Sequence, residues 1–235
     1  MRSALLAIVW VLVSSTSYAQ DELKTDHGDS AIFNYIRTEI DYTPQEDGLF
    51  SWDVTGWIGG DSERVWVRSE GEIEDGHTGA AEAQIFYGWN VDPFWDVLIG
   101  ARQDFDPRST TYLAASLVGL AKYDFETEAS LYLSHRGDVS ARLEQSFDFL
   151  LTQHLIAEPH AQLDVFAQDV PELGIGAGIS QVEIGVQLRY EITRKFAPYI
   201  DAVWERKIGE TSSIARQAGE DPEQATVRVG VRFWF

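Results

Sequence analysis

Apolar and polar residues alternate along this chain with a period of two, most clearly in the last ten residues. One face carries Val227, Val229, Val231, Phe233 and Phe235, and the other carries Thr226, Arg228, Gly230, Arg232 and Trp234. A period of two is that of a β-strand. Strands of soluble sheets usually have about five or six residues, whereas about ten residues are needed to cross a bilayer. The last ten residues therefore predict a membrane-spanning strand whose valine and phenylalanine face meets lipid.

About twelve segments show this alternation, and together they predict an all-β fold, a transmembrane antiparallel β-barrel. The weakest is 111–121, in which both faces are apolar. The alternative is a soluble β-sandwich, which would turn its apolar faces inward and use shorter strands. The predicted strands are 31–42, 50–59, 63–73, 81–91, 94–104, 111–121, 124–134, 139–150, 154–167, 181–192, 196–208 and 226–235.

The connections between these segments alternate between short and long, as do the periplasmic turns and external loops of outer-membrane barrels. An even number of strands places both ends of the barrel in the periplasm. The glycine-rich run 174–178 has no βαβ unit around it and predicts a flexible external loop. The short connections are 60–62, 92–93, 122–123, 151–153 and 193–195, and the longer ones are 43–49, 74–80, 105–110, 135–138, 168–180 and 209–225.

The first 19 residues predict a cleaved secretory signal peptide. Arg2 supplies the positive start, 4–13 is apolar, and Ser17-Tyr-Ala19 is a small-residue cleavage site. The apolar run is too short to cross a bilayer as a helix; a retained N-terminal anchor or a buried helix is the alternative. Residues 20–30 then form a short polar periplasmic leader, and 31–235 form the barrel. This export route predicts the outer membrane of a Gram-negative bacterium.

The composition agrees with a barrel and narrows the choice of ligand. Eight Trp, nine Tyr and twelve Phe residues suit aromatic girdles at the two membrane interfaces. The mean hydropathy of −0.20 is modest because one face of each strand is polar. There is no cysteine, and the net charge is −20. This charge disfavours nucleic acid as a partner and favours cations, although a solvated acidic surface would carry the same charge.

The predicted inward faces are rich in charge, with more acids than bases. Cross-strand ion pairs can fill a narrow lumen and hold the strand register. A ring of carboxylates can instead attract cations. Both interpretations stand. The inward acids are Glu39, Asp41, Asp53, Glu70, Glu72, Glu82, Asp96, Glu126, Glu128, Glu144, Asp148, Glu158, Asp164, Glu183, Glu191, Asp201 and Glu205, and the bases are Arg37, Arg64, Arg68, Arg102, Arg142, Arg189, Arg228 and Arg232.

Among the five histidines, His160 is the candidate metal ligand. His154 and His160 share one face of a strand but lie about 20 Å apart, so they cannot bind the same ion. His160 has Glu158 beside it on the inward face, and an imidazole with carboxylates suits a transition metal. The alternative is an ordinary lumen histidine. No nucleophile–base constellation is present, so we predict that the protein is not an enzyme.

Several stretches resemble the copper resistance protein B family of outer-membrane proteins, in order from about residue 45 to the end. They include Trp52-Asp-Val-Thr-Gly-Trp57, Leu188-Arg-Tyr-Glu-Ile192, Phe196-Ala-Pro-Tyr-Ile200, Trp204-Glu-Arg-Lys207 and Val229-Gly-Val-Arg-Phe-Trp-Phe235. The resemblance implies an outer-membrane barrel that handles copper ions. It also implies a periplasmic copper-binding protein and a multicopper oxidase as partners. The terminal Phe235 resembles the signal that the barrel-assembly machinery reads during biogenesis.

One departure from the family concerns the ligands. Members commonly carry a Met- and His-rich segment before the barrel, whereas 20–30 has only His27 and the sole methionine is Met1. Copper is therefore expected as Cu²⁺, a substrate bound by imidazole and carboxylates rather than by sulfur. The candidate metal residues are His160, Glu158, Asp164 and Glu144. The alternative is a structural or interaction barrel whose lumen is plugged by salt bridges.

Overall fold

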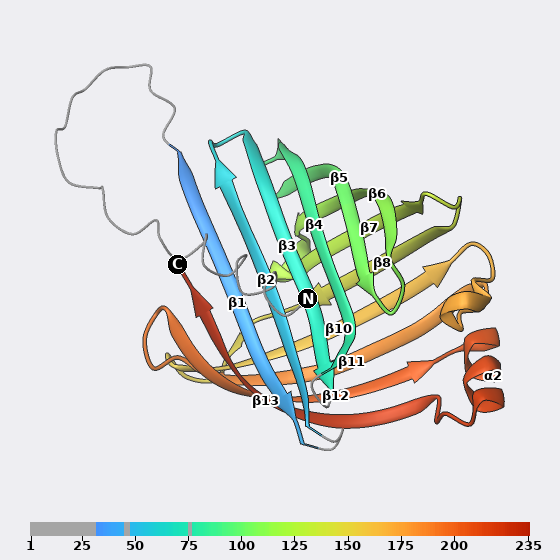
Figure 1. The fold of residues 1–235 in the computed structure, drawn as a ribbon. Helices are drawn as coiled ribbons and strands as arrows, with labels where there is room; N and C mark the ends of the chain where they lie inside the picture. The colour runs from blue at the N-terminus through green and yellow to red at the C-terminus, as the bar shows by residue number, and fades with distance from the viewer. Residues whose placement is uncertain (1–31, 45–47, 75–76) are drawn as a thin grey trace, which may run out of the picture. The chain divides into compact units, whose positions relative to one another are not determined.

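The structure is a computed structural model that describes residues 32–44, 48–74 and 77–235. Its strands form one antiparallel sheet (Figure 1). They are β1 (Phe33–Thr43), β2 (Leu49–Gly59), β3 (Glu63–Glu74), β4 (His77–Asp92), β5 (Trp95–Asp106), β6 (Thr110–Leu120), β7 (Glu126–Ser134), β8 (Val139–Ser146), β9 (Phe149–Leu150), β10 (Leu155–Phe166), β11 (Gly178–Tyr190), β12 (Phe196–Lys207) and β13 (Glu223–Trp234). The helices are η1 (Lys122–Asp124), η2 (Pro171–Leu173) and α2 (Gly209–Ala218).

The sheet closes on itself into a barrel. Neighbouring strands in the sequence pair with one another, and β13 returns to pair with β1 in the register Arg37↔Trp234. Phe235 extends this closure, because Ile36 N–H donates to its carbonyl at 3.1 Å and its own N–H donates to the Ile36 carbonyl at 2.9 Å. A closed sheet has no unpaired edge, which a backbone inside lipid requires. The predicted transmembrane β-barrel is confirmed.

The barrel has twelve strands in the sense of the prediction, because β8 and β9 are two parts of one strand. Both pair with β10 in the same register, Ser146↔His160 and Leu150↔Ile156. The break lies opposite Pro159, which has no N–H to donate to the ladder. Phe147 still donates to the Pro159 carbonyl at 3.1 Å. The predicted strand 139–150 is thus interrupted by one missing donor and not by a turn.

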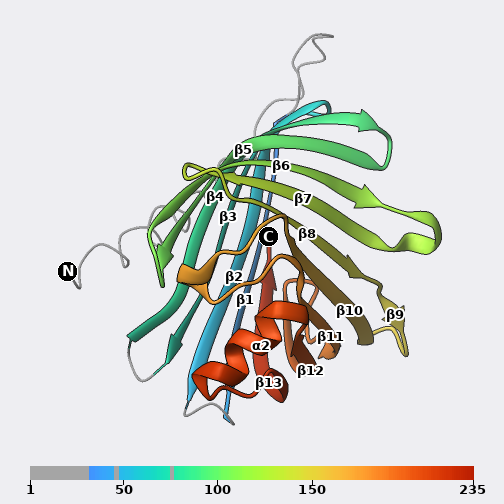
Figure 2. The ribbon, with the colours of Figure 1, turned by 90° about the vertical axis from the view of Figure 1, so that its right-hand side faces the viewer.

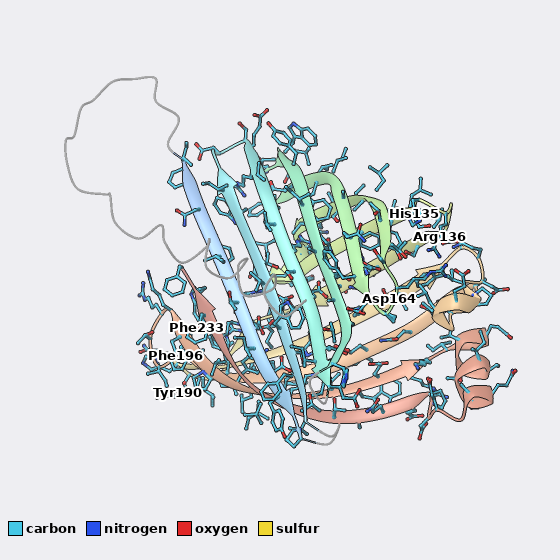
Figure 3. All side chains as sticks on the ribbon, in the orientation of Figure 1. His135, Arg136, Asp164, Tyr190, Phe196 and Phe233 are labelled. Atoms are coloured by element: carbon cyan, nitrogen blue, oxygen red, sulfur yellow. The ribbon has the colours of Figure 1, made fainter. Side chains whose placement is uncertain are left out.

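The outer face of the barrel is apolar over the middle of the strands. Ile184, Val186 and Val229 are each about half exposed, whereas Arg189 and Arg232 on the opposite faces are buried. Figure 3 shows Tyr190, Phe196 and Phe233 together at one end of the barrel, with His135 and Arg136 toward the other. Apolar bands between aromatic ends are typical of outer-membrane barrels.

The strand predictions were accurate, but the predicted lengths of the connections were partly wrong. The connection predicted at 74–80 is much shorter, because β4 begins at His77 and pairs with Glu74. Polar residues such as Thr78 can continue a strand where water replaces lipid, and the hydropathy pattern does not mark that extension. The connection predicted at 105–110 shortens in the same way, since β5 runs to Asp106 and β6 starts at Thr110.

The two longest connections are folded, which the sequence pattern did not predict. The 209–225 segment contains the helix α2, and Figure 2 shows α2 across one end of the barrel. Gly176 packs on this helix: its N–H donates to Thr211 Oγ1 at 3.0 Å, and a Cβ there would lie 2.3 Å from Glu210 Cβ. The predicted external loop is present at this end of the barrel, and its glycine gives α2 room to approach; its flexibility stays a prediction.

Part of the lumen is filled by an apolar core, which also explains the weak strand 111–121. Arg68 stacks on this core, 5.4 Å from the Phe86 ring, and Arg102 lies 4.9 Å from the Tyr132 ring. Ala114 in β6 is 1 % exposed because it faces this core and not an open channel. The core residues are Trp66, Phe86, Leu98, Ala114 and Tyr132, with Trp57, Tyr112 and Val118 packed against them.

Within the described residues, no helix has the length and apolar character needed to cross a membrane. The predicted signal peptide and the polar leader at 20–30 lie outside the described residues.

Candidate functional site

Two cavities formed by the described residues lie along the lumen, one toward each end of the barrel. The first has a volume of about 510 Å³ and reaches the loop end, where Arg108, Leu173 and Ile175 line it. The second has a volume of about 590 Å³ and reaches the short-turn end, where Leu120 and Ser146 line it. We name them the loop-side and the turn-side cavity. Each is large enough for a hydrated metal ion but small for a polymer or a large metabolite.

The two cavities meet at one layer of side chains, which we name the neck. At its centre is Arg37, whose guanidinium lies 3.4 Å from Glu39 and 3.9 Å from Asp53. A layer shared by both cavities is the place where anything moving along the lumen must pass. The neck residues, which line both cavities, are Arg37, Glu39, Asp53, Glu70, Gln187 and Asp201.

Carboxylates outnumber basic side chains along both cavities. In the turn-side cavity the bases are Arg37, Arg68 and Arg232, together with His160. In the confined space of a barrel this excess creates a negative potential that attracts cations and repels anions. The acids lining the turn-side cavity are Glu39, Asp53, Glu70, Glu126, Glu128, Glu144, Glu158, Glu183 and Asp201.

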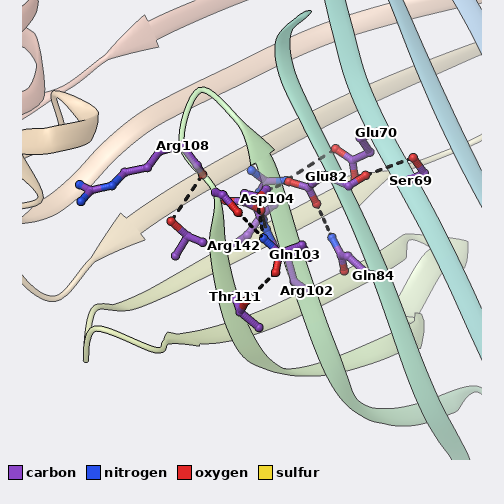
Figure 4. Close-up of polar contacts among 12 residues, drawn as sticks. Ser69, Glu70, Glu82, Gln84, Arg102, Gln103, Asp104, Arg108, Thr111 and Arg142 are labelled. Carbon is purple, nitrogen blue, oxygen red and sulfur yellow. Dashed lines mark hydrogen bonds and ion pairs between the residues drawn. The ribbon is translucent and has the colours of Figure 1, made fainter. Parts of the chain in front are cut away.

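Arginine pairs nevertheless hold many of these acids in place. On the wall made by β4 and β5, Arg102 contacts Glu82 at 2.5 Å and donates through Nε to Asp104 at 2.7 Å (Figure 4). Gln84 donates to the same Glu82 at 2.5 Å. Arg68 pairs with Glu128 across the lumen. The Arg102 contacts lie within the β4–β5 wall and fix its register, whereas the Arg68–Glu128 pair joins β3 and β7, which are not neighbours, and so holds opposite walls together.

A second network joins the strands at the barrel closure. Arg189 pairs with Glu158 and with Asp148, and Arg232 contacts Glu158 at 2.9 Å and Glu39 at 2.8 Å. Glu158 therefore sits between two buried arginines. Its negative charge is largely neutralised by them.

The structure does not bring the four predicted metal residues into one group. Glu158 lies with Arg189 and Arg232, Asp164 accepts from Arg142 Nε at 2.8 Å, and Glu144 is 3.8 Å from Arg142. His160 lies instead beside Asp201, with Nε2 3.1 Å from Oδ1 and 3.2 Å from Oδ2. Over the described part of the chain, no three His, Cys, Asp or Glu side chains are arranged as a ready-made metal site.

Comparison with known proteins decides the family. Residues 32–235 match the family described as "Copper resistance protein B precursor (CopB)". The chain belongs to the copper resistance protein B family. It is 45% identical over 187 residues to "Copper resistance protein B" of Escherichia coli, an alignment that covers 79% of this chain and 63% of that protein. It is 43% identical over 210 residues to "Copper resistance protein B homolog" of Pseudomonas syringae pv. tomato, with 88% and 71% covered.

The chain spans less than two thirds of the length of the E. coli family member. Among solved structures, the NanC porin is similar with a TM-score of 0.55 and 15% identity over 84% of this chain and 98% of the porin. The KdgM porin is similar with a TM-score of 0.51 and 9% identity over 86% of this chain and 99% of the porin. These likenesses show the fold, an outer-membrane barrel. A copper resistance protein B chain with this fold lies in the outer membrane of a Gram-negative bacterium.

The loop end of this family member is also tied by ion pairs. Glu172 of η2 accepts from Arg136 at 3.0 Å and pairs with Arg108, which joins three connections. Near α2, Lys207 donates to Glu220 at 2.9 Å, and this hydrogen bond together with the lysine charge lowers the pKa of Glu220. Ion pairs therefore connect the loops at this end of the barrel to one another and to β12.

Sequence reasoning missed the contact between His160 and Asp201. Both were placed on the inward face, but the pairing of β10, β11 and β12 decides whether they meet. The sequence feature that could have indicated this contact is Gly185 on β11, the strand between the two residues. Gly185 pairs with His160 on β10 and with Val203 on β12, two residues from Asp201. A glycine in the middle of a strand is a mark of close approach by another group.

Proposed function

We propose that this barrel binds copper ions in its acidic lumen and passes them between the loop-side and turn-side cavities. Copper is the substrate that moves, and no catalytic step is part of the proposal. The observation that carries it is the excess of carboxylates along both cavities in a chain of a copper-resistance family. The periplasmic copper-binding protein and multicopper oxidase expected from the resemblance would then exchange copper with the turn-side end.

The ligands of the chain favour Cu²⁺ over Cu⁺. The sequence has no cysteine, and its sole methionine is Met1, so thioether and thiolate ligands are lacking in the barrel. Imidazole and carboxylate oxygens suit Cu²⁺. In the proposal, His160 supplies the nitrogen ligand, and Glu158, Asp164 and Glu144 supply negative charge along the same wall. The arginines paired with these acids limit how much each contributes.

Copper analysis of the purified barrel tests the proposal. Neutralising Glu144, Glu158 and Asp164 together with His160→Ala should reduce the copper content of the folded protein. Deleting residues 20–30 should leave the copper content unchanged, because that leader offers only His27 as a soft or nitrogen ligand. Copper that stays with the lumen variant, or leaves with the leader, would contradict the proposal.

A structural or interaction barrel is the second candidate, and a specific observation favours it. The apolar core around Phe86 and Leu98 and the arginine pairs fill much of the lumen. A barrel of this kind would conduct no ions and would bind no copper in its lumen, so the same purified protein distinguishes the two candidates.

A further inference from the structure

His160 and Asp201 meet across an intervening strand inside the turn-side cavity. His160 is on β10 and Asp201 is on β12, with β11 between them. The Nε2 atom is nevertheless 3.1 and 3.2 Å from the two carboxylate oxygens. Asp201 is 5 % exposed and belongs to the neck, so this contact lies where the two cavities join.

Gly185 on β11 makes the contact possible. It stands opposite His160 in the strand register, and a Cβ on it would lie 2.3 Å from His160 Nε2 and 2.4 Å from Cε1. Real Cβ atoms do not approach other atoms so closely. The imidazole therefore crosses β11 through space that only glycine leaves free. The contact depends on three residues far apart in the sequence, His160, Gly185 and Asp201.

Asp201 differs from the other acids of this wall in its partners. Glu158 and Asp164 are paired with arginines, whereas in the described chain no arginine nitrogen lies within ion-pair distance of Asp201. In the described residues its carboxylate is hydrogen-bonded to His160, and Arg228, opposite it on β13, interacts with it electrostatically without forming an ion pair. A carboxylate without an arginine ion pair keeps the charge that a cation needs, and beside an imidazole it offers oxygen and nitrogen ligands together.

The second nitrogen of the ring faces another acid. His160 Nδ1 is 4.0 Å from Glu183 Oε1, and Glu183 is also 3.6 Å from Arg228. Asp201 is the nearer carboxylate and accepts a hydrogen bond from Nε2, so Cu²⁺ would displace the Nε2 proton when it binds this nitrogen. With Cu²⁺ on Nε2, the remaining ring proton would be on Nδ1, on the side of Glu183, which is where an outer acid orients a histidine ligand. Two ligand atoms bound at roughly right angles to one ion lie about 3 Å apart, as Nε2 and Oδ1 do.

We propose that His160 and Asp201 form a two-ligand transit site for Cu²⁺ at the neck, completed by water, with Glu183 as the residue that orients the imidazole. This proposal rests on the proposed function and narrows it to one pair of side chains. Two protein ligands hold an ion less tightly than the three or four of a storage site. Conduction requires such a site, favourable enough to enter and weak enough to leave.

Cu²⁺ titration of the purified, folded full chain, followed by electron paramagnetic resonance, tests this site. His160→Ala and Asp201→Asn should each weaken Cu²⁺ binding by about tenfold or more. His160→Ala should also remove the nitrogen hyperfine pattern from the bound-copper spectrum. His160→Gln serves as a second variant that keeps a polar side chain in the space if alanine impairs folding.

Matched variants separate the site from general effects. His154→Ala changes a histidine directly before β10 that contacts the Glu191 carbonyl, and Asp41→Asn changes a lumen acid held by Ser51 and Tyr199. Both should leave Cu²⁺ affinity within about twofold of the unchanged protein, because neither removes a ligand from the pair. Each control carries the same chemical change as the variant that it accompanies.

Gly185→Ala tests the geometry without touching either ligand. The added methyl group should displace the imidazole and weaken Cu²⁺ binding as His160→Ala does. Gly230→Ala is its control, since that glycine clears Tyr199, whose ring carbon would lie 2.5 Å from the added Cβ. Gly230→Ala should bind Cu²⁺ normally.

The outcomes also separate this proposal from the one on which it rests. Unchanged affinity and an unchanged nitrogen pattern in His160→Ala or His160→Gln, with copper still in the lumen, would overturn the site alone. An unchanged protein that binds no Cu²⁺ would overturn both the site and the proposed function.

Discussion

At the residue scale, the lumen is organised by arginines that each contact more than one acid. Glu158 illustrates this, since it contacts both Arg189 and Arg232, which are 5 % and 8 % exposed. A buried charge that loses a partner is costly, because no water replaces the lost contact. The arrangement therefore makes single acids on this wall important to stability as well as to the potential of the lumen.

We expect Glu158→Gln to destabilise the folded barrel by about 2 kcal/mol, the value typical of a hydrogen bond to a charged group. Urea-induced unfolding in phospholipid vesicles measures this difference. Glu220→Gln is the control: its carboxylate pairs with Lys207 in a fully exposed position, so no measurable loss is expected. Equal stability of the two variants would show that the network around Glu158 contributes little.

Residue identity predicted which acids and bases face inward, but it did not predict which of them meet. His160 and Asp201 are the clearest case. Shifting β10 against β11 by two residues keeps every side chain on its face, yet it would place His160 opposite Gln187 and away from Gly185. The alternation shows which face each residue is on. The register also depends on the folded connection after β10, where η2 and the contact of Gly176 with α2 leave no periodic signal.

At the element scale, the alternation was a strong signal because lipid selects one face of every strand. The elements it missed are those outside the lipid, such as α2 and the start of β4, where no apolar face is required. The alternation of apolar and polar residues also did not show that strands between β3 and β7 turn aromatic side chains into the lumen. Trp66 and Phe86 face the lumen although their residue types suggest lipid.

Strand depth makes a prediction at this scale. Ile184 lies at the middle of β11 and is 50% exposed to lipid, whereas Ile192 follows the same strand at the short-turn end. Ile184→Arg should cost about 2–4 kcal/mol of folding free energy, and Ile192→Arg about 0–1 kcal/mol, because the cost of a charge falls toward the interface. Equal costs in vesicle unfolding would contradict the placement of β11 across the membrane.

At the scale of the whole molecule, the barrel is closed, acidic inside and narrowed by its own side chains. The family was evident from the sequence, because long matching stretches follow one another in order. The shape of the lumen was not evident from the sequence, because the two cavities and the neck are formed by side chains from strands that are far apart in the chain. The described residues thus combine an excess of negative charge, which attracts cations, with a constriction that limits what can pass.

The reversal potential of the purified barrel in a planar lipid bilayer under a salt gradient tests the central claim most directly. The account predicts a small, cation-selective conductance, with Cu²⁺ carrying or blocking current from the loop side. The variant in which Glu144, Glu158 and Asp164 are neutralised together with His160→Ala should show weaker selectivity, because the acids of the turn-side wall set the potential. A barrel that inserts but conducts no ions, or one that selects anions, would contradict the account and favour the plugged structural barrel.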